Sequence, residues 1–138
     1  MVLNQISVFL ENKAGRLADA TAAIAGAGVN VRAISIADTA DFGILRVIVD
    51  DPVKALDALA RSGFTTRTAD VLSLEIADRP GALAEVLAAF KETGVNIEYL
   101  YASLEKNADK AVVIFKVEDV RRGLEIARQR GLTQAGSF

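Results

Sequence analysis

The chain contains the same stretch twice. The first copy, NKAGRLADATAAIAGAGVNV, covers residues 12–31, and the second, DRPGALAEVLAAFKETGVNI, covers residues 78–97. A shift of 66 positions aligns the copies without a gap, and eight of the twenty positions are identical. A self-similarity of this length indicates one supersecondary unit that is built twice. It outweighs the length of 138 residues, which alone would suggest a single domain.

Each copy begins as a strand, a turn and a helix. An alternating apolar run, as expected of a strand, precedes the copies at residues 6–10 and 71–76. Apolar residues then recur at a spacing of three to four, which predicts helices at about 15–27 and 81–93. The whole module reads as βαββαβ, and the repeat continues into the back half with a shift of 68. The predicted elements of the first module are strands at 4–10, 30–37, 44–49 and 64–68 and helices at 15–27 and from Pro52 to about 61. Those of the second are strands at 71–76, 96–104 and 111–117 and helices at 81–93 and 120–130.

Glycines mark both ends of the first helix of each module. Gly15 and Gly81 are expected to allow a close backbone approach at the turn into the helix. Gly28 and Gly94 fit a left-handed cap at its end. The predicted turn at 105–110 is polar, and the tail at 132–138 is expected to form a poor final strand or a frayed end.

The predicted fold class is α+β, with two ferredoxin-like modules at residues 1–69 and 70–138. Each has an antiparallel sheet with both helices on one face. A module of this size buries only about 60% of its unfolded surface, and no flexible spacer separates the two. We therefore expect the modules to associate within a chain, and chains to form a homodimer through exposed sheet edges. This fold by itself implies no function.

The composition argues against several classes of protein. Histidine and cysteine are absent, which removes the usual zinc sites, thiol nucleophiles and the commonest general base. No phosphate-binding or dinucleotide-binding loop occurs, so we expect no enzyme, no metal and no cofactor. The net charge is −2 without a basic block, which argues against nucleic acid as a partner. The chain starts without the pattern of a signal peptide and has no apolar run of about 20 residues, so we expect no membrane partner and a cytoplasmic location.

The motifs resemble the ACT domain. In both copies an Asn or Asp, a Gly and a Leu follow a strand, and the helix ends in Gly-Val-Asn. The second copy, DRPGAL followed by GVNI, is close to the consensus of the family, and the first departs from it with Ala14 in place of proline. The chain as a whole is similar to small stand-alone tandem ACT proteins without an attached enzyme. The resemblance implies a regulatory protein of amino-acid metabolism that binds a free amino acid as an allosteric effector between ACT modules. A regulated metabolic enzyme is then an expected partner.

The resemblance also implies the residues of a binding site. In the serine-sensing regulatory domain of phosphoglycerate dehydrogenase, an Asn of the loop and the Asn of the GVNI motif contact the effector. In the present chain these positions are Asn12, Asn30, Asp78 and Asn96. That domain also uses a histidine two residues before the loop Asn. Leu10 and Ile76 stand there in this chain, so that contact to serine is missing.

Physical chemistry supports the same loops. The start of a helix presents unpaired N–H groups and the positive end of a dipole, which suit a carboxylate. A carboxamide can bind either end of an amino acid, and Asp78 can accept from its ammonium group with charge assistance. Pro80 has no N–H to contribute. We expect the ligand at the junction of the modules, near these residues: Asn12, Ala14, Gly15, Arg16, Leu17, Asn30, Asp78, Pro80, Gly81, Ala82, Leu83 and Asn96.

Five of these residues also have a purely structural interpretation. The glycines are needed by the turn whether or not a ligand binds. Asn30 and Asn96 could cap the preceding helix in a left-handed conformation, and Asp78 could be an N-cap. The alternative function is accordingly an oligomerisation or protein-interaction module that binds no effector.

Overall fold

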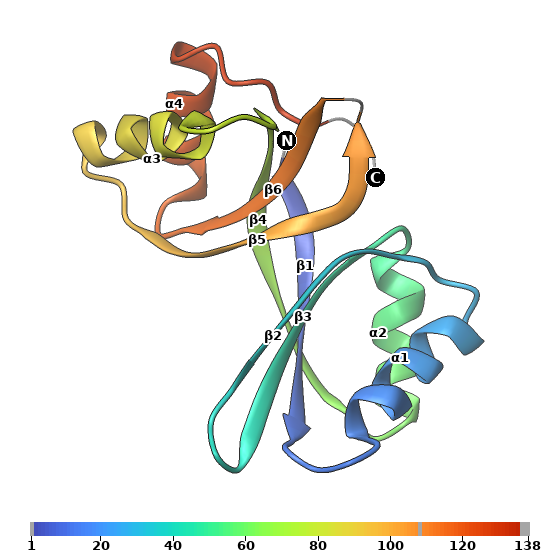
Figure 1. Cartoon of the computed structure of the whole chain (residues 1–138). Helices are drawn as coiled ribbons and strands as arrows, with labels where there is room; N and C mark the ends of the chain where they lie inside the picture. The colour runs from blue at the N-terminus through green and yellow to red at the C-terminus, as the bar shows by residue number, and fades with distance from the viewer. Residues whose placement is uncertain (1, 108, 136–138) are drawn as a thin grey trace. The chain divides into compact units, whose positions relative to one another are not determined.

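The computed structural model describes residues 2–107 and 109–135, except for the side chains of residues 105–107. Helices and strands follow one another along the chain as drawn in Figure 1. Their order and bounds are β1 (Val2–Glu11), α1 (Arg16–Gly26), β2 (Val31–Asp38), β3 (Phe42–Val49), α2 (Pro52–Arg61), β4 (Thr65–Ala77), α3 (Ala82–Thr93), β5 (Ile97–Asn107), β6 (Lys110–Val117) and α4 (Val120–Gln129).

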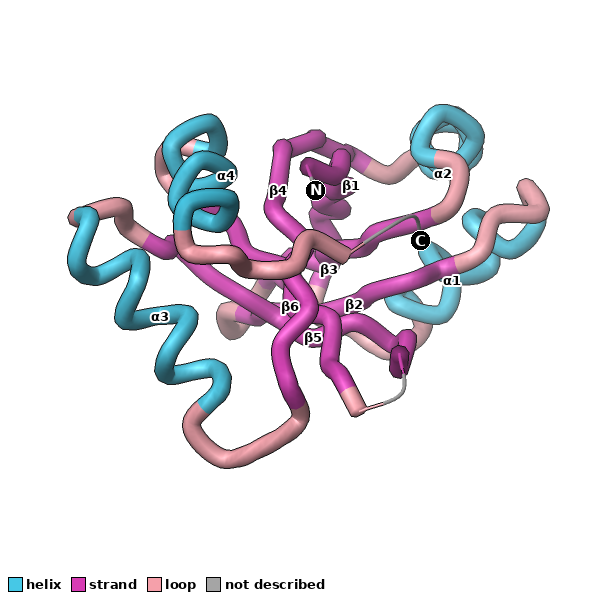
Figure 2. The backbone as a smooth tube through the Cα atoms, turned by 90° about the horizontal axis from the view of Figure 1, so that it is seen from above, coloured by secondary structure: helices cyan, strands magenta, loops and turns pink. Residues whose placement is uncertain are grey.

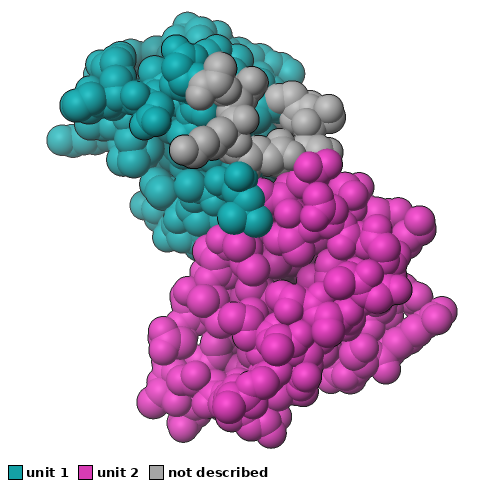
Figure 3. All heavy atoms as spheres, turned by 45° about the vertical axis from the view of Figure 1, so that its right-hand side comes forward, with its two compact units in different colours: residues 1–3, 70–138 teal, residues 4–69 magenta. Residues whose placement is uncertain are grey.

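The chain divides into two compact units (Figure 3). The N-terminal unit comprises residues 4–69, and the C-terminal unit comprises residues 70–138 together with residues 1–3. Strand β4 runs through the boundary, so it ends the first βαββαβ series and begins the second. The sequence predicts separate strands at 64–68 and 71–76. The structure joins them because no glycine or proline interrupts the extended chain between them.

The N-terminal unit contains an antiparallel sheet in the order β1–β3–β2. In its register Ile6 lies opposite Val47, and Val8 lies opposite Leu45. Because side chains alternate between the two faces of a strand, these four share one face, and helices α1 and α2 cover it. The core comprises Ile6, Val8, Leu10, Ala20, Ile24, Val29, Leu45, Val47, Val49, Ala55, Leu59 and Phe64.

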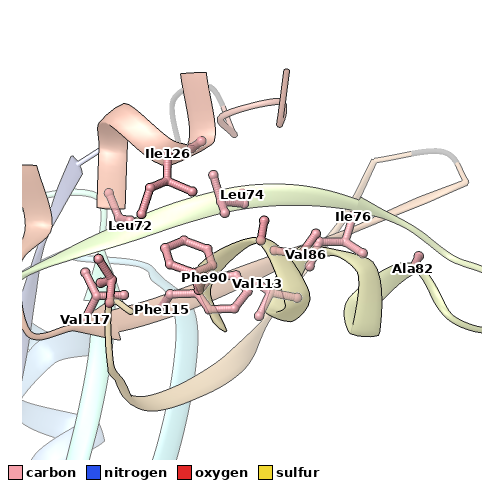
Figure 4. Close-up of a cluster of buried hydrophobic side chains, with 13 residues drawn as sticks. Leu72, Leu74, Ile76, Ala82, Val86, Phe90, Val113, Phe115, Val117 and Ile126 are labelled. Atoms are coloured by element: carbon pink, nitrogen blue, oxygen red, sulfur yellow. The ribbon is translucent and has the colours of Figure 1, made fainter. Parts of the chain in front are cut away.

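The C-terminal unit repeats this arrangement with β4–β6–β5, again antiparallel. Helices α3 and α4 cover the face that carries Leu72, Leu74 and Phe115. In Figure 4 the ring of Phe90 on α3 lies beside that of Phe115, and the two rings stack with centroids 6.1 Å apart. The unit thus has a core of its own, equivalent to that of the N-terminal unit.

The final strand of the C-terminal unit is short, as the sequence suggests. Gln134 forms an isolated antiparallel bridge with Leu74 of β4. Thr133 accepts a hydrogen bond from the N–H of Glu75 at 2.8 Å. The described residues do not include 136–138, which complete the predicted tail, or residue 108 of the predicted turn.

Each unit is therefore a ferredoxin-like module of the α+β class, with both helices on one side of its strands (Figure 2). This confirms the predicted fold class. Local signals position the second helix of each module. The side chain of Asp51 accepts from the N–H of Lys54 at 3.1 Å, and that of Asp119 accepts from Arg122 at 3.0 Å. Both are N-caps, and Pro52 begins α2 where its missing N–H is not needed.

Candidate functional site

The loops before α1 and α3 enter their helices with the same backbone conformation. Each helix starts after a left-handed glycine, with φ of 88° at Gly15 and 86° at Gly81. A Cβ atom at either position would meet nothing within 4 Å. The expected close approach of another backbone is therefore wrong, and the positive φ is what requires glycine. The space beside each glycine is open.

A side chain at these glycines should strain the loop. We expect Gly81→Ala to lower the free energy of unfolding by about 1–2 kcal/mol, because a non-glycine residue is disfavoured in the left-handed region. Gly26→Ala is the matched control: Gly26 is helical, its φ is not positive and its Cβ position is open. That change should keep or raise the stability. Urea unfolding of the two variants measures the difference, and equal effects would contradict the assignment.

The first turns of α1 and α3 carry backbone N–H groups that lack an acceptor. The N–H groups of Asp19 and Glu85 already bond to the carbonyls of Gly15 and Gly81, at 2.9 and 3.0 Å. Among the described residues, four groups just before them find no acceptor: the N–H groups of Leu17, Ala18, Leu83 and Ala84. Together with the positive end of the helix dipole, such groups favour an anion.

Asn12 lies in the first loop and is tied to the β2–β3 hairpin. Its Nδ2 donates to the carbonyl oxygens of Thr39 at 3.3 Å and Ala40 at 3.2 Å. Its backbone N–H donates to the carbonyl of Asp41 at 2.9 Å. The amide nitrogen is therefore occupied by the protein itself, and Oδ1 is what this side chain offers to a ligand.

Asp78 takes the equivalent place in the second loop. Its backbone N–H donates to the carbonyl of Asp109 at 2.9 Å, which repeats the contact to the hairpin. Its carboxylate is exposed, and no described residue donates a hydrogen bond to it. The helix cap is Gly81, without a side-chain hydrogen bond, so the interpretation of Asp78 as an N-cap is wrong.

A cation stands beside each helix start. In the first loop the guanidinium of Arg16 lies over the ring of Phe64, 4.5 Å from its centroid. Its Nη1 is 3.3 Å from Oδ2 of Asp19. In the second loop Arg79 donates to both carboxylate oxygens of Glu85, at 2.8 and 3.2 Å. These hydrogen bonds, and after them the charge of Arg79, lower the pKa of Glu85 below its ordinary value and raise that of Arg79.

The pKa of Glu85 gives a pH-dependent prediction. Because it is lowered in the folded chain, the ion pair is complete above the ordinary glutamate pKa of about 4.3. It is lost as the pH falls through the lowered value. An NMR titration of the Glu85 carboxyl should therefore show a midpoint that rises in Arg79→Ala. Arg121→Ala, which removes an exposed arginine of α4, should leave the midpoint where it is. An unchanged midpoint in Arg79→Ala would contradict the pairing.

Asn30 and Asn96 stand after the first helix of each module. The N–H of Asn30 donates to Oδ1 of Asp50 at 3.0 Å, and the N–H of Asn96 donates to Oε1 of Glu118 at 3.0 Å. In return the N–H of each acid donates to the carbonyl of the asparagine, at 3.1 and 3.0 Å. The structure thus uses the backbone of these residues and leaves both side chains exposed.

One module does not bring its loop and its asparagine together. Asn12 and Asn30 lie beyond opposite ends of α1, whose 11 residues span ~16 Å. Asp78 and Asn96 are separated in the same way by the 12 residues of α3. The ammonium and carboxylate of an amino acid sit on one carbon. A single module therefore cannot place both of its members on the backbone groups of one ligand.

The remaining predicted residues occupy the loops and first turns. The exposed ones are Ala14, Gly15, Leu17, Pro80, Gly81 and Leu83. Arg16 is half-buried, and Ala82 is buried in the core with its N–H bonded to the carbonyl of Arg79 at 3.3 Å. Ala82 therefore offers a ligand neither side chain nor backbone donor. Three residues outside the predicted set, Ala18, Ala84 and Arg79, lie at the same helix starts.

Other surface features lie away from these loops. One hollow between α1 and α2 is lined by Ala23, Gly26, Ala27, Lys54, Asp57, Ala58, Arg61 and Ser62. A second on α4 is lined by Asp119, Arg121, Arg122, Glu125 and Arg128. Within the described part of the chain, no group of three or more Asp or Glu residues could hold a metal ion. None of the helices described above is long and apolar enough to cross a membrane.

The sequence model of the family described as an ACT domain pair matches residues 1–134. The chain belongs to this family. The match covers both units, and it agrees with the repeated loop, the helix and the Gly-Val-Asn motif. No curated protein matches the chain.

Solved structures with a similar fold were also found. Protein BT0572 from Bacteroides thetaiotaomicron is 39% identical, with a TM-score of 0.92, over 99% of this chain and 94% of that one. The ligand-free regulatory subunit of aspartate kinase from Thermus thermophilus is 21% identical, with a TM-score of 0.66, over 91% and 90%. The corresponding subunit from Thermus flavus is 22% identical, with a TM-score of 0.62, over 91% and 90%. The similarity to the two Thermus structures shows only that the fold is shared.

Proposed function

We propose that the chain is a non-catalytic sensor that binds a free amino acid and regulates a partner in amino-acid metabolism. One observation carries the proposal: an open, glycine-entered helix start with unpaired N–H groups, built twice in a member of the ACT domain pair family. The N–H groups of Leu83 and Ala84, or of Leu17 and Ala18, bind the α-carboxylate. The loop side chain that precedes them accepts from the α-ammonium.

The asparagines complete the site from a second ACT module. Because each stands beyond the far end of its own helix, a ligand at one loop meets Asn30 or Asn96 only where two modules come together. The exposed carboxamide provides a donor and an acceptor for the polar end of the ligand. Binding of the effector thereby stabilises one pairing of modules relative to another. The regulated partner protein responds to this change in pairing.

The regulated partner is proposed by analogy. The two Thermus proteins with this fold are regulatory subunits of aspartate kinase. We therefore assign the present chain to the control of an enzyme that makes or consumes amino acids, acting through contact and not through chemistry of its own.

A second candidate is an oligomerisation module without an effector. Large apolar side chains are exposed on both units: Phe42 is 60% exposed, Leu104 63% and Ile36 51%. This candidate places them in an interface between chains, where they would form part of a contiguous apolar patch. This candidate predicts association of chains that no amino acid changes.

A thermal-shift screen of the twenty free amino acids separates the two candidates. At 100 times its dissociation constant, a ligand that binds the folded chain adds about 2.7 kcal/mol. We expect one or a few amino acids to raise the unfolding temperature. Their N-acetyl and amide derivatives, which lack the ammonium or the carboxylate, should not. No shift with any of the twenty would refute the sensor and leave the oligomerisation module.

A further inference from the structure

We propose that the exposed face of α4 is a docking surface for an acidic helical segment of the regulated partner. The segment carries an acid, a base and a second acid at positions i, i+4 and i+7 of one helix face. This surface presupposes the protein partner of the proposed function, and adds where and by which charges that partner is held. It does not depend on the binding of an amino acid.

Helix α4 is fixed against the C-terminal unit. Ile126 is 3% exposed, and a Cβ atom at Gly123 would lie only 2.8 Å from the side chain of Leu72. At the start of the helix, Nη2 of Arg122 donates to the carbonyl of Thr93 at the end of α3, at 2.7 Å. The helix therefore cannot roll on the sheet, and its outer face keeps one direction.

The outer face carries an open hollow of about 580 Å³ that is lined by charged residues alone: Asp119, Arg121, Arg122, Glu125 and Arg128. Arg121, Glu125 and Arg128 stand at i, i+4 and i+7, so they lie in one line along the helix. Among the described residues, no group accepts from the guanidinium of Arg121 or Arg128, and Glu125 accepts only from Gln129, at 3.4 Å. The stripe is positive, negative and positive, and both of its cations are available to a partner.

The repeat shows that the fold does not require these arginines. At the shift of 68, Arg121 and Arg128 correspond to Val53 and Ala60 of α2. Both helices nevertheless begin after an aspartate cap and cover equivalent sheets. The charged stripe is therefore a property of α4 and not of the module.

The arrangement of charge argues against other anionic occupants. Residues 70–138 contain nine Lys and Arg against eleven Asp and Glu, so the arginines of α4 stand on a unit of negative net charge. A nucleic acid would meet this net charge, and Glu125 in the middle of the stripe would repel its phosphates. A single phosphate or carboxylate is too small to meet both arginines, because seven residues of a helix span ~10.5 Å.

A facing helix has the matching spacing. Its positions i and i+7 lie on one face and are also separated by ~10.5 Å. Residues on one face of a strand are separated by ~6.6 or ~13 Å, which fits less well. Two acids on such a helix meet Arg121 and Arg128, and a base between them meets Glu125. Each exposed ion pair contributes about 2- to 5-fold to the affinity, so several pairs must act together.

Two designed peptides test the charge pattern. Both are alanine-rich helices, one with Glu, Lys and Glu at i, i+4 and i+7 and the other with Lys, Glu and Lys. In an NMR titration the Glu-Lys-Glu peptide should shift the amide signals of Arg121, Glu125 and Arg128. It should bind more tightly than its reverse, although the net charge of −2 attracts the reverse, and salt should weaken the contact. Equal affinities, shifts away from α4, or tighter binding of single-stranded DNA there would overturn the proposal.

Variants of α4 test the residues. Arg121→Ala and Arg128→Ala together should weaken binding of the Glu-Lys-Glu peptide about 4- to 25-fold, as two independent exposed pairs do. Arg61→Ala removes an exposed arginine of α2 and is the matched control, with no change expected. Circular dichroism verifies the fold of each variant.

The thermal shift by free amino acids separates this surface from the sensor. The double variant of α4 should keep that shift. Undiminished peptide binding by the double variant would overturn the docking surface while the sensor stands. A chain that binds the peptide at α4 but none of the twenty amino acids would support the docking surface and refute the sensor.

Discussion

Replacing Phe90 with alanine is expected to lower the free energy of unfolding of the C-terminal unit by about 3–5 kcal/mol. Phe90 is 1% exposed, and its ring stacks on that of Phe115 with centroids 6.1 Å apart. Truncation removes this contact and leaves a cavity between α3 and the sheet, because a close-packed core closes only partly around a lost ring. Since marginal domains have stabilities of about 5–15 kcal/mol, the loss is a large part of the total.

Phe42→Ala is the control for Phe90. Phe42 is the same residue type but is 60% exposed at the start of β3, and surface changes of this kind alter stability by about 0.5 kcal/mol or less. Urea unfolding followed by circular dichroism measures both variants. A Phe90→Ala protein as stable as Phe42→Ala would mean that α3 does not pack on the sheet as described.

Removing the carboxamides of Asn30 and Asn96 together is expected to abolish most of the amino-acid binding while the chain stays folded. Loss of one hydrogen-bonding partner costs about 1–3 kcal/mol, or about a 5- to 150-fold loss of affinity. The fold should tolerate the change because the structure uses the backbone of both residues, through their pairs with Asp50 and Glu118. The side chains themselves are exposed.

Calorimetry on Asn30→Ala, Asn96→Ala and the double variant distinguishes the two asparagines. If one of them serves the occupied site, one single variant reproduces the effect of the double variant. Asn4→Ala, another exposed asparagine outside the loops, is the control. Unchanged affinity in all three test variants would exclude these residues from the site.

The repeat and its local signals made the fold predictable from sequence. Gly28 and Gly94 are left-handed in the structure, with φ of 71° and 73°, as their places after a predicted helix suggest. Pro52 begins α2 after the cap at Asp51. These features depend on neighbouring residues in the chain, and such short-range rules apply equally in both copies.

The details of the loops depend on partners far away in sequence and could not be predicted in this way. The side chain of Asn12 bonds to Thr39 and Ala40, on a hairpin whose position is set by the sheet register. The pair between Arg79 and Glu85 joins residues only six positions apart, but whether they meet depends on the backbone conformation of the turn at Gly81. The N–H groups of Ala18 and Ala84 could have been predicted as ligand donors from the sequence, because the first four N–H groups of any helix lack partners within it.

The proposed function requires that a free amino acid binds at a glycine-entered helix start. A crystal structure of the chain with the amino acid that gives the largest thermal shift tests this most directly. We expect density for the carboxylate within hydrogen-bond distance of the N–H groups of Leu83 and Ala84, and density for the ammonium at the carboxylate of Asp78. An amino acid bound away from both helix starts, for example in the hollow between α1 and α2, would contradict it.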